Sequence, residues 1–429
     1  MSRRTGLILF LLFAAAFLVM NRGAYRGYFQ DDEIDNLSWT PHLPASDYLE
    51  AALTPRFFPN NFRPVGHFYF RETEHFCGLD FPRYVAVIHV LHLLNVWLIW
   101  LLARRLGARP WPAAAACLFF GFHMALFDAL WKPMYVFDVL CATFCLLSLL
   151  CYARGRWVLA FASFWLAYKA KELAVMLPVV LACYEIGFGQ RRWKPLVPFF
   201  AASLSFGLQG LLLNPNRDND YTFRFTLAAL AKTGRFYAER IFLVPYLGLA
   251  LPLAAWVAAN RRTFFGLAMM GLFFFPLLFL PGRLFAAYCY VPFIGLAVAL
   301  AGICETARPA FVALFLALWL PQDLHVLRVE RRETLARDTQ VRAWMTALGT
   351  FAKYGPPVEA FVFSGAPAGF ERWGVEGAVK YFYKRGDLRI YADGEPAAAQ
   401  ALASSRVAIM TWDGAGLSVV EHAPRGTVQ

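Results

Sequence analysis

Charged residues are scarce in this sequence. They make up 16% of its 429 residues, whereas soluble domains carry about 25%. Hydrophobic residues make up 59% of the chain and gather in long apolar runs. A shortage of charge together with many such runs indicates a polytopic membrane protein.

The sequence also lacks the cysteine patterns of a metal-binding or disulfide-rich protein. None of its eight cysteines forms a CxxC pair, and all except Cys77 lie in apolar runs, where cysteine behaves as a small hydrophobe. This distribution argues against a zinc site, thioredoxin-like chemistry and a disulfide framework. No internal repeat or low-complexity segment is evident either.

The net charge of +12 does not indicate a nucleic-acid partner. Most basic residues stand in short clusters between apolar runs, so we interpret them as topology signals and contacts to membrane lipids. Residues 5–21 resemble the apolar part of a signal peptide, but no small-x-small cleavage site follows them. We therefore expect an uncleaved first span with a cytoplasmic N-terminus.

About eleven apolar segments are expected to cross the membrane. Alternate connections between them carry the arginine clusters, and the positive-inside rule then places the loop at 22–82 and the C-terminus on the outer side. The predicted spans are 5–21, 83–103, 111–127, 133–152, 156–170, 172–188, 195–213, 235–259, 263–280, 283–303 and 308–326.

The composition changes near residue 327, which divides the chain into a membrane module at 1–327 and a small α/β domain at 328–429. The second part begins with a charged helix and has alternating patterns typical of strands. It has no Gly-rich phosphate loop and no Ser/His/Asp arrangement. The expected elements are strands near 357–363, 387–391, 405–411 and 416–421 and a helix near 370–383.

Four carboxylates lie within five residues just after the first span, at Asp31, Asp32, Glu33 and Asp35. Carboxylates at a membrane surface can act as a general base, as metal ligands or as an ion site. Like-charge repulsion should raise the pKa of at least one of them, unless a cation neutralises the group. A divalent metal is therefore a candidate ligand here, and a solvated loop with an aspartate as helix cap is the alternative.

Basic residues on the predicted outer side form the second set of candidates. Arg63 is held by the following Pro64, and a fixed arginine can pair with a carboxylate or bind an anion. Lys171 and Glu172 lie at the junction of two short apolar spans, where Lys171 could bind a phosphate with Glu172 orienting it. Snorkelling lysines and surface ion pairs are the alternatives.

A third set could complete a polar site on the same side. Arg283 is followed by Tyr288 and Tyr290, which together could hold an anionic headgroup or form an aromatic belt. His123 and Asp128 could complete the same site or be satisfied interfacial groups. A helical pair of histidines with a nearby asparagine is better explained by helix–helix hydrogen bonds than by metal. These three residues are His89, His92 and Asn95.

The order of these motifs resembles that of the GT-C fold glycosyltransferases that use polyprenyl-phosphate sugars. The nearest likeness is to the protein O-mannosyltransferases of the transmembrane and tetratricopeptide-repeat type and to their bacterial relatives. The resemblance covers about residues 1–326. It rests on Asp31-Asp32 with Asn36, Phe62-Arg63-Pro64-Val65, Tyr84 to Leu101, Lys171-Glu172 and Arg283 to Pro292.

The resemblance implies an inverting hexosyl transfer on the outer face of a bacterial inner membrane. Arg283, Lys171 and, third, Arg63 would bind the donor phosphate. Asp31 or Asp32 would deprotonate the acceptor, which could be a protein, a glycan or a lipid. Phosphate is already a good leaving group, so no metal is required. Glu172, Tyr288, Tyr290, His123 and Asp128 would support the site.

This sequence departs from the family pattern, and other functions compete with transfer. A small α/β domain replaces the tetratricopeptide repeats, and Lys169 is an additional lysine. A transporter or flippase of a lipid-linked anion would use the same basic residues and broken helices, but the long outer loop does not favour it. A structural membrane subunit would tolerate substitution of Asp32 and Arg283.

Overall fold

The computed structural model describes residues 3–56, 62–213 and 219–424. Residues 57–61 of the predicted outer loop lie outside this part of the chain. The chain divides into two compact units. The helical unit consists of Met1–Arg22, Ala45–Gly66 and Val85–Val329, and the α/β unit of Gly23–Pro44, His67–Tyr84 and Glu330–Gln429.

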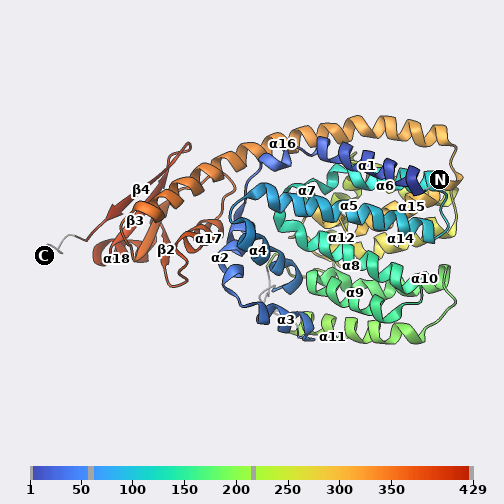
Figure 1. The fold of residues 1–429 in the computed structure, drawn as a ribbon, viewed down its shortest axis with the longest axis horizontal. Coiled ribbons are helices and arrows are strands. Elements are labelled where there is room, and N and C mark those ends of the chain that lie inside the picture. Colours follow the sequence, from blue (N-terminus) through green and yellow to red (C-terminus); the bar gives the residue numbers. More distant parts are fainter. Residues whose placement is uncertain (1–2, 57–61, 214–218, 425–429) are drawn as a thin grey trace. The chain divides into compact units, whose positions relative to one another are not determined.

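The helices of the helical unit run roughly side by side (Figure 1). Each of the eleven predicted apolar segments overlaps at least one of its α-helices, which confirms a largely helical membrane fold. The helices that lie wholly or partly in this unit are α1 (Arg3–Met20), α3 (Ala45–Leu53), α4 (Pro64–Cys77), α5 (Phe81–Arg105), α6 (Pro110–Phe122), α7 (Phe127–Trp131), α8 (Val136–Ala153), α9 (Trp157–Ala170), α10 (Leu177–Gly187), α11 (Val197–Leu213), α12 (Leu227–Phe242), α13 (Leu251–Val257), α14 (Arg261–Phe274), α15 (Pro292–Thr306) and α16 (Pro309–Tyr354).

Not every predicted span is a full-length membrane helix. Among the described residues, five helical segments are long and apolar enough to cross a membrane, or up to seven if two bent pairs each count as one span. Three further apolar helices, α1, α9 and α15, are shorter. The estimate of about eleven therefore includes these short helices and α10.

The predicted break between two short spans is present. Helix α9 ends at Ala170 because Lys171 is extended, with φ −159° and ψ 139°. The short 3-10 helix η5 (Glu172–Met176) then leads into α10. Irregular backbone in an apolar bundle must be packed within protein, and Lys171 is buried. The break therefore places a charged side chain inside the unit.

Polar side chains on α5 join the helices of this unit. His92 lies 2.8 Å from the Tyr290 hydroxyl, and Asn95 donates to the same hydroxyl at 3.2 Å. His89 contacts the carbonyl of Leu130 at 3.1 Å. These bonds confirm that the histidine pair and Asn95 link helices.

The α/β unit contains a four-stranded sheet of order β2-β1-β3-β4. Strand β1 pairs parallel with β2 and β3, and β4 is antiparallel to β3. Alternate residues of β1 point to opposite faces: Ala360 packs in a cluster with α18, and Phe361 meets Tyr383 of α17. The unit also takes in parts of α4, α5 and α16. Its own elements include α2 (Asp31–Trp39), β1 (Ala360–Ser364), α17 (Arg372–Tyr383), β2 (Arg389–Ala392), α18 (Pro396–Ser404), β3 (Val407–Trp412) and β4 (Leu417–His422).

The predicted strands and the helix near 370–383 agree with these elements, whereas α18 was not expected. The α/β unit contains more of the chain than the C-terminal residues alone. It includes residues 23–44 and 67–84, nearly all of which belong to the predicted first outer loop at 22–82. The carboxylate cluster on α2 therefore packs within the same unit as the sheet.

Candidate functional site

A buried ion pair lies at the α9 break in the helical unit. The Lys171 ammonium is 2.6 Å from both carboxylate oxygens of Asp138 on α8. It also lies 4.1 Å from the centre of the Tyr288 ring. Both charged side chains are buried, so each needs the other to offset the cost of leaving water.

Tyr288 connects Lys171 to Arg283. The Arg283 guanidinium donates to the Tyr288 hydroxyl at 3.1 Å, whereas Lys171 lies over the ring of the same tyrosine. The guanidinium also lies over the rings of Tyr221 and Phe285, at 4.4 and 4.5 Å. The structure thus brings together two of the three predicted phosphate-binding residues.

Arg63 forms a neighbouring ion pair with Glu172. Its Nε donates to the two carboxylate oxygens at 2.9 and 3.1 Å, and its guanidinium lies over Phe137. Because Phe137 precedes Asp138 and Glu172 follows Lys171, the two ion pairs are adjacent along the chain. Three cations and two carboxylates leave this basic group, which consists of Arg63, Asp138, Lys171, Glu172 and Arg283, with one positive charge.

The pairing differs from the hypothesis that Glu172 orients Lys171. Glu172 instead accepts from Arg63, and Asp138 is the acceptor for Lys171. From the sequence, Asp138 is one of several polar groups near helix ends. A carboxylate within an apolar helix requires a cation, but the sequence does not show which one.

Tyr237 of α12 is a further candidate that the sequence did not indicate. Its hydroxyl is buried and has no hydrogen-bond partner among the described residues. It interacts electrostatically with Tyr288 and Asp138. Because buried hydroxyls are normally hydrogen-bonded, this oxygen is suited to a ligand at the basic group.

Three predicted supporting residues have other contacts. His123 is buried, lies 2.9 Å from the Ile241 carbonyl and accepts from the Ala125 amide. Asp128 pairs with Lys132 at 2.6 Å, and Tyr290 bonds His92 and Asn95. The contacts of His123 and Tyr290 join helices, and the Asp128 pair lies within one short segment.

The second predicted site lies on α2 in the α/β unit. This helix begins at Asp31 with a capping box: the Gln30 side chain accepts from the helix backbone, and Glu33 accepts from the Gln30 amide at 2.6 Å. Glu33 is therefore a buried capping residue. Asp31 and Asp32 remain as candidates for chemistry.

Helix α17 contacts both of these aspartates. The Glu371 amide donates to Asp31 Oδ1 at 2.8 Å, and the Trp373 indole donates to Asp32 Oδ1 at 3.1 Å. Burial raises the pKa of Asp31 to about 6, and the charge of Asp32 adds to this effect while the Glu371 bond opposes it. The expected pKa elevation thus has burial as its main cause.

Two glycines allow α17 to approach α2. A Cβ atom at Gly374 would lie 2.5 Å from Asp31 Oδ1, and one at Gly377 would lie 2.9 Å from the Asp35 backbone. Both distances are shorter than van der Waals contact. The absence of a side chain at Gly374 and Gly377 therefore allows α17 to pack closely against the carboxylates of α2.

Within the described residues, no group of three or more His, Cys, Asp or Glu side chains could hold a metal ion.

The fold belongs to a known class of polytopic membrane protein, the GT-C fold. Its solved representatives include ArnT from Cupriavidus metallidurans bound to undecaprenyl phosphate, with 13% identity, a TM-score of 0.54 and coverage of 96% of this chain and 94% of that chain. The apo state of that protein gives 12% identity, a TM-score of 0.51 and the same coverage.

A second similar structure is the arabinofuranosyltransferase AftD from Mycobacteria. It shares 14% identity with a TM-score of 0.58 over 96% of this chain, which spans 35% of AftD. No family model and no curated protein sequence matches this chain. At these identities, the structural likeness establishes the fold.

The α2–α17 contact can be tested by Gly374→Val. The added side chain must displace the Asp31 carboxylate or α17, so we expect a loss of about 1–3 kcal/mol in the free energy of unfolding. Hydrogen exchange of α2 amides in the purified full chain should become faster. Gly386→Val is the control, because a Cβ there meets nothing within 4 Å. Equal exchange in the two variants would contradict the close contact.

Proposed function

We propose that this protein is a membrane glycosyltransferase that moves a sugar from a polyprenyl-phosphate donor to an acceptor. The observation that carries the proposal is the basic group of the helical unit, where Lys171 and Arg283 meet on Tyr288. The GT-C fold supports it, since one protein with this fold is described with bound undecaprenyl phosphate.

The basic group would bind the donor phosphate. Arg283 and Lys171 are the first choices and Arg63 the third, with Tyr237 and Tyr288 as hydroxyl partners. The surplus positive charge of the group favours an anion. Asp138 and Glu172 hold Lys171 and Arg63 in place before the phosphate arrives, so little reorganisation is needed when charge develops on the leaving group.

An aspartate of α2 would act as the general base. The acceptor hydroxyl would attack the anomeric carbon from the side opposite the phosphate, which inverts that centre. The new carbon–oxygen bond forms as the bond to the phosphate oxygen breaks. The proton passes to the aspartate, and polyprenyl phosphate leaves. A pKa of about 6 suits Asp31 to this task near neutral pH, and Asp32 is the alternative.

The predicted topology completes the proposal. The N-terminus would be cytoplasmic, and both the site and the α/β domain would face the outside of a bacterial inner membrane. The donor sugar would be a hexose, as the O-mannosyltransferase likeness implies. Transfer in detergent, where no gradient exists, would distinguish this enzyme from a transporter or flippase.

Replacing each aspartate by asparagine identifies the base. If Asp31 is the base, Asp31→Asn should lower the rate of transfer in detergent by about 100-fold or more, and Asp32→Asn should lower it less. Donor binding should be retained in both. Asp47→Asn, at an exposed residue of α3, is the control. Full activity of both variants would exclude an aspartate base at this position.

The pH dependence of transfer provides an independent test of Asp31. Its pKa is raised to about 6, so the ionised base is present above this pH and is lost as the pH falls through it. The rate should therefore decline below about pH 6 in the wild type, and below a lower pH in Asp32→Asn, because loss of the Asp32 charge lowers the pKa of Asp31. A pH profile with no limb between pH 5 and 7 would contradict the assignment.

Variants of the Lys171–Asp138 ion pair can separate the effect of Lys171 on folding from its effect on donor binding. Lys171→Met leaves a buried carboxylate unpaired and should destabilise the protein by about 3–5 kcal/mol. The double variant Lys171→Met/Asp138→Leu removes both charges and should regain thermal stability.

Transfer should remain impaired in the double variant, because the phosphate ligand is still missing. The Arg235→Gln substitution, at an exposed ion pair of α12, is the control for loss of a cation. Recovery of activity together with stability would show that Lys171 has only a structural role.

A further inference from the structure

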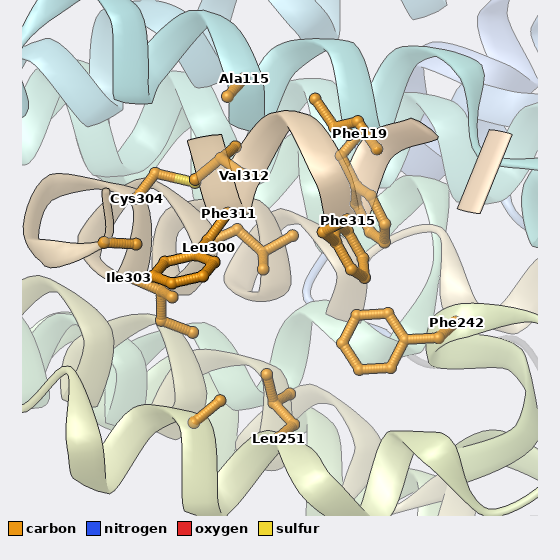
Figure 2. A pocket seen from close by; sticks show the side chains of 13 residues that line it. Ala115, Phe119, Phe242, Leu251, Leu300, Ile303, Cys304, Phe311, Val312 and Phe315 are labelled. Carbon is orange, nitrogen blue, oxygen red and sulfur yellow. The ribbon is translucent and has the colours of Figure 1, made fainter. Parts of the chain in front are cut away.

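An apolar cavity of about 230 Å³ lies between α6, α15, α16 and the α12–α13 segment (Figure 2). Its lining consists of apolar side chains. Phe315 approaches the rings of Phe119 and Phe242 at 6.2 and 5.6 Å, which makes one aromatic wall. Other lining residues are Ala115, Leu251, Cys304 and Phe311.

This cavity is separate from the basic group. Arg283 and Tyr288 precede the first residue of α15, Pro292, whereas Cys304 and Ala307 lie at the other end of the helix. A helix of 15 residues is about 22 Å long at about 1.5 Å per residue. The cavity also has no group that could bind a phosphate, so it is not a second donor-phosphate site.

Arginines lie close to lining residues at the end of α15. Glu305, next to Cys304, accepts from the Arg109 amide and guanidinium and from Arg262 at 3.0 Å. Because two guanidinium groups pair with one carboxylate, this group has one net positive charge. Arg308, next to Ala307, is exposed and adds another. Basic groups at the ends of membrane helices attract anionic lipid headgroups.

Apolar side chains in the cavity lining and on α13 are exposed. Phe311 of α16 is 63% exposed, and Trp256 of α13 is 74% exposed. In a membrane such side chains meet lipid. The cavity is smaller than the roughly 300–1,000 Å³ of small-molecule sites and lacks the polar groups that orient such ligands. It therefore fits a segment of a single hydrocarbon chain.

We propose that this apolar cavity holds an acyl chain of an anionic phospholipid, whose headgroup lies at Arg308 and Arg262. Charged residues follow the lining residues Cys304 and Ala307 directly in the chain, so basic side chains lie beside an apolar interior, as the two parts of a phospholipid require. A polyprenyl chain from the donor is the competing occupant, which the experiment must distinguish. The proposal does not depend on the transferase activity.

Native mass spectrometry of the full chain, delipidated in detergent, can measure lipid binding. The probes are phosphatidylglycerol, phosphatidylcholine and undecaprenyl phosphate. Cys304→Phe should fill the cavity and lower phosphatidylglycerol binding at least tenfold. Leu314→Phe, at an exposed site of α16 outside the lining, is the matched control and should bind normally. Ala254→Phe, at an exposed lining residue, provides a second filled variant if Cys304→Phe does not fold.

Arg308→Gln tests the headgroup. It should reduce the preference for phosphatidylglycerol over phosphatidylcholine several-fold and leave binding of phosphatidylcholine unchanged. Equal phosphatidylglycerol binding by the filled variants and Leu314→Phe would overturn the proposal. So would displacement of phosphatidylglycerol by equimolar undecaprenyl phosphate, which would assign the cavity to the donor chain.

Discussion

The candidate site of the helical unit depends on the buried ion pair between Lys171 and Asp138. The break after α9 turns the Lys171 backbone out of helical geometry, and the lysine then needs an anion because it is buried. Asp138 supplies it from α8. The pair also holds the ammonium over Tyr288, so one electrostatic constraint determines both the packing of the break and the position of a cation.

A different constraint acts in the α/β unit. The carboxylates of α2 are held by an amide and an indole of α17, and two glycines permit this approach. The same burial that fixes Asp31 raises its pKa to about 6. Stability and chemistry are therefore linked: a change that separates the two helices would also return the Asp31 carboxyl to water and lower its pKa.

Much of the fold could be predicted, because its signals are local. Each of the eleven predicted apolar runs overlaps an α-helix, and alternation located the strands. The lengths of the shorter helices could not be predicted, since the packing of each segment decides where its helix ends. For the candidate site, the sequence indicated Lys171, Glu172, Arg63 and Arg283, which lie together in the structure. It did not indicate that Asp138 pairs with Lys171 or that the Tyr237 hydroxyl is buried, because both depend on neighbours in other helices.

The sequence by itself determined the membrane class, the break at 170–172 and the position of the carboxylate cluster, because length, hydropathy and charge are properties of consecutive residues. Only the tertiary structure determined which ion-pair and hydrogen-bond partners these residues have. Lys171 and Asp138 are 33 residues apart, and Asp31 and Glu371 are 340 apart. Which oppositely charged or hydrogen-bonding groups meet depends on how helices pack, and several residues of each type were available along the chain.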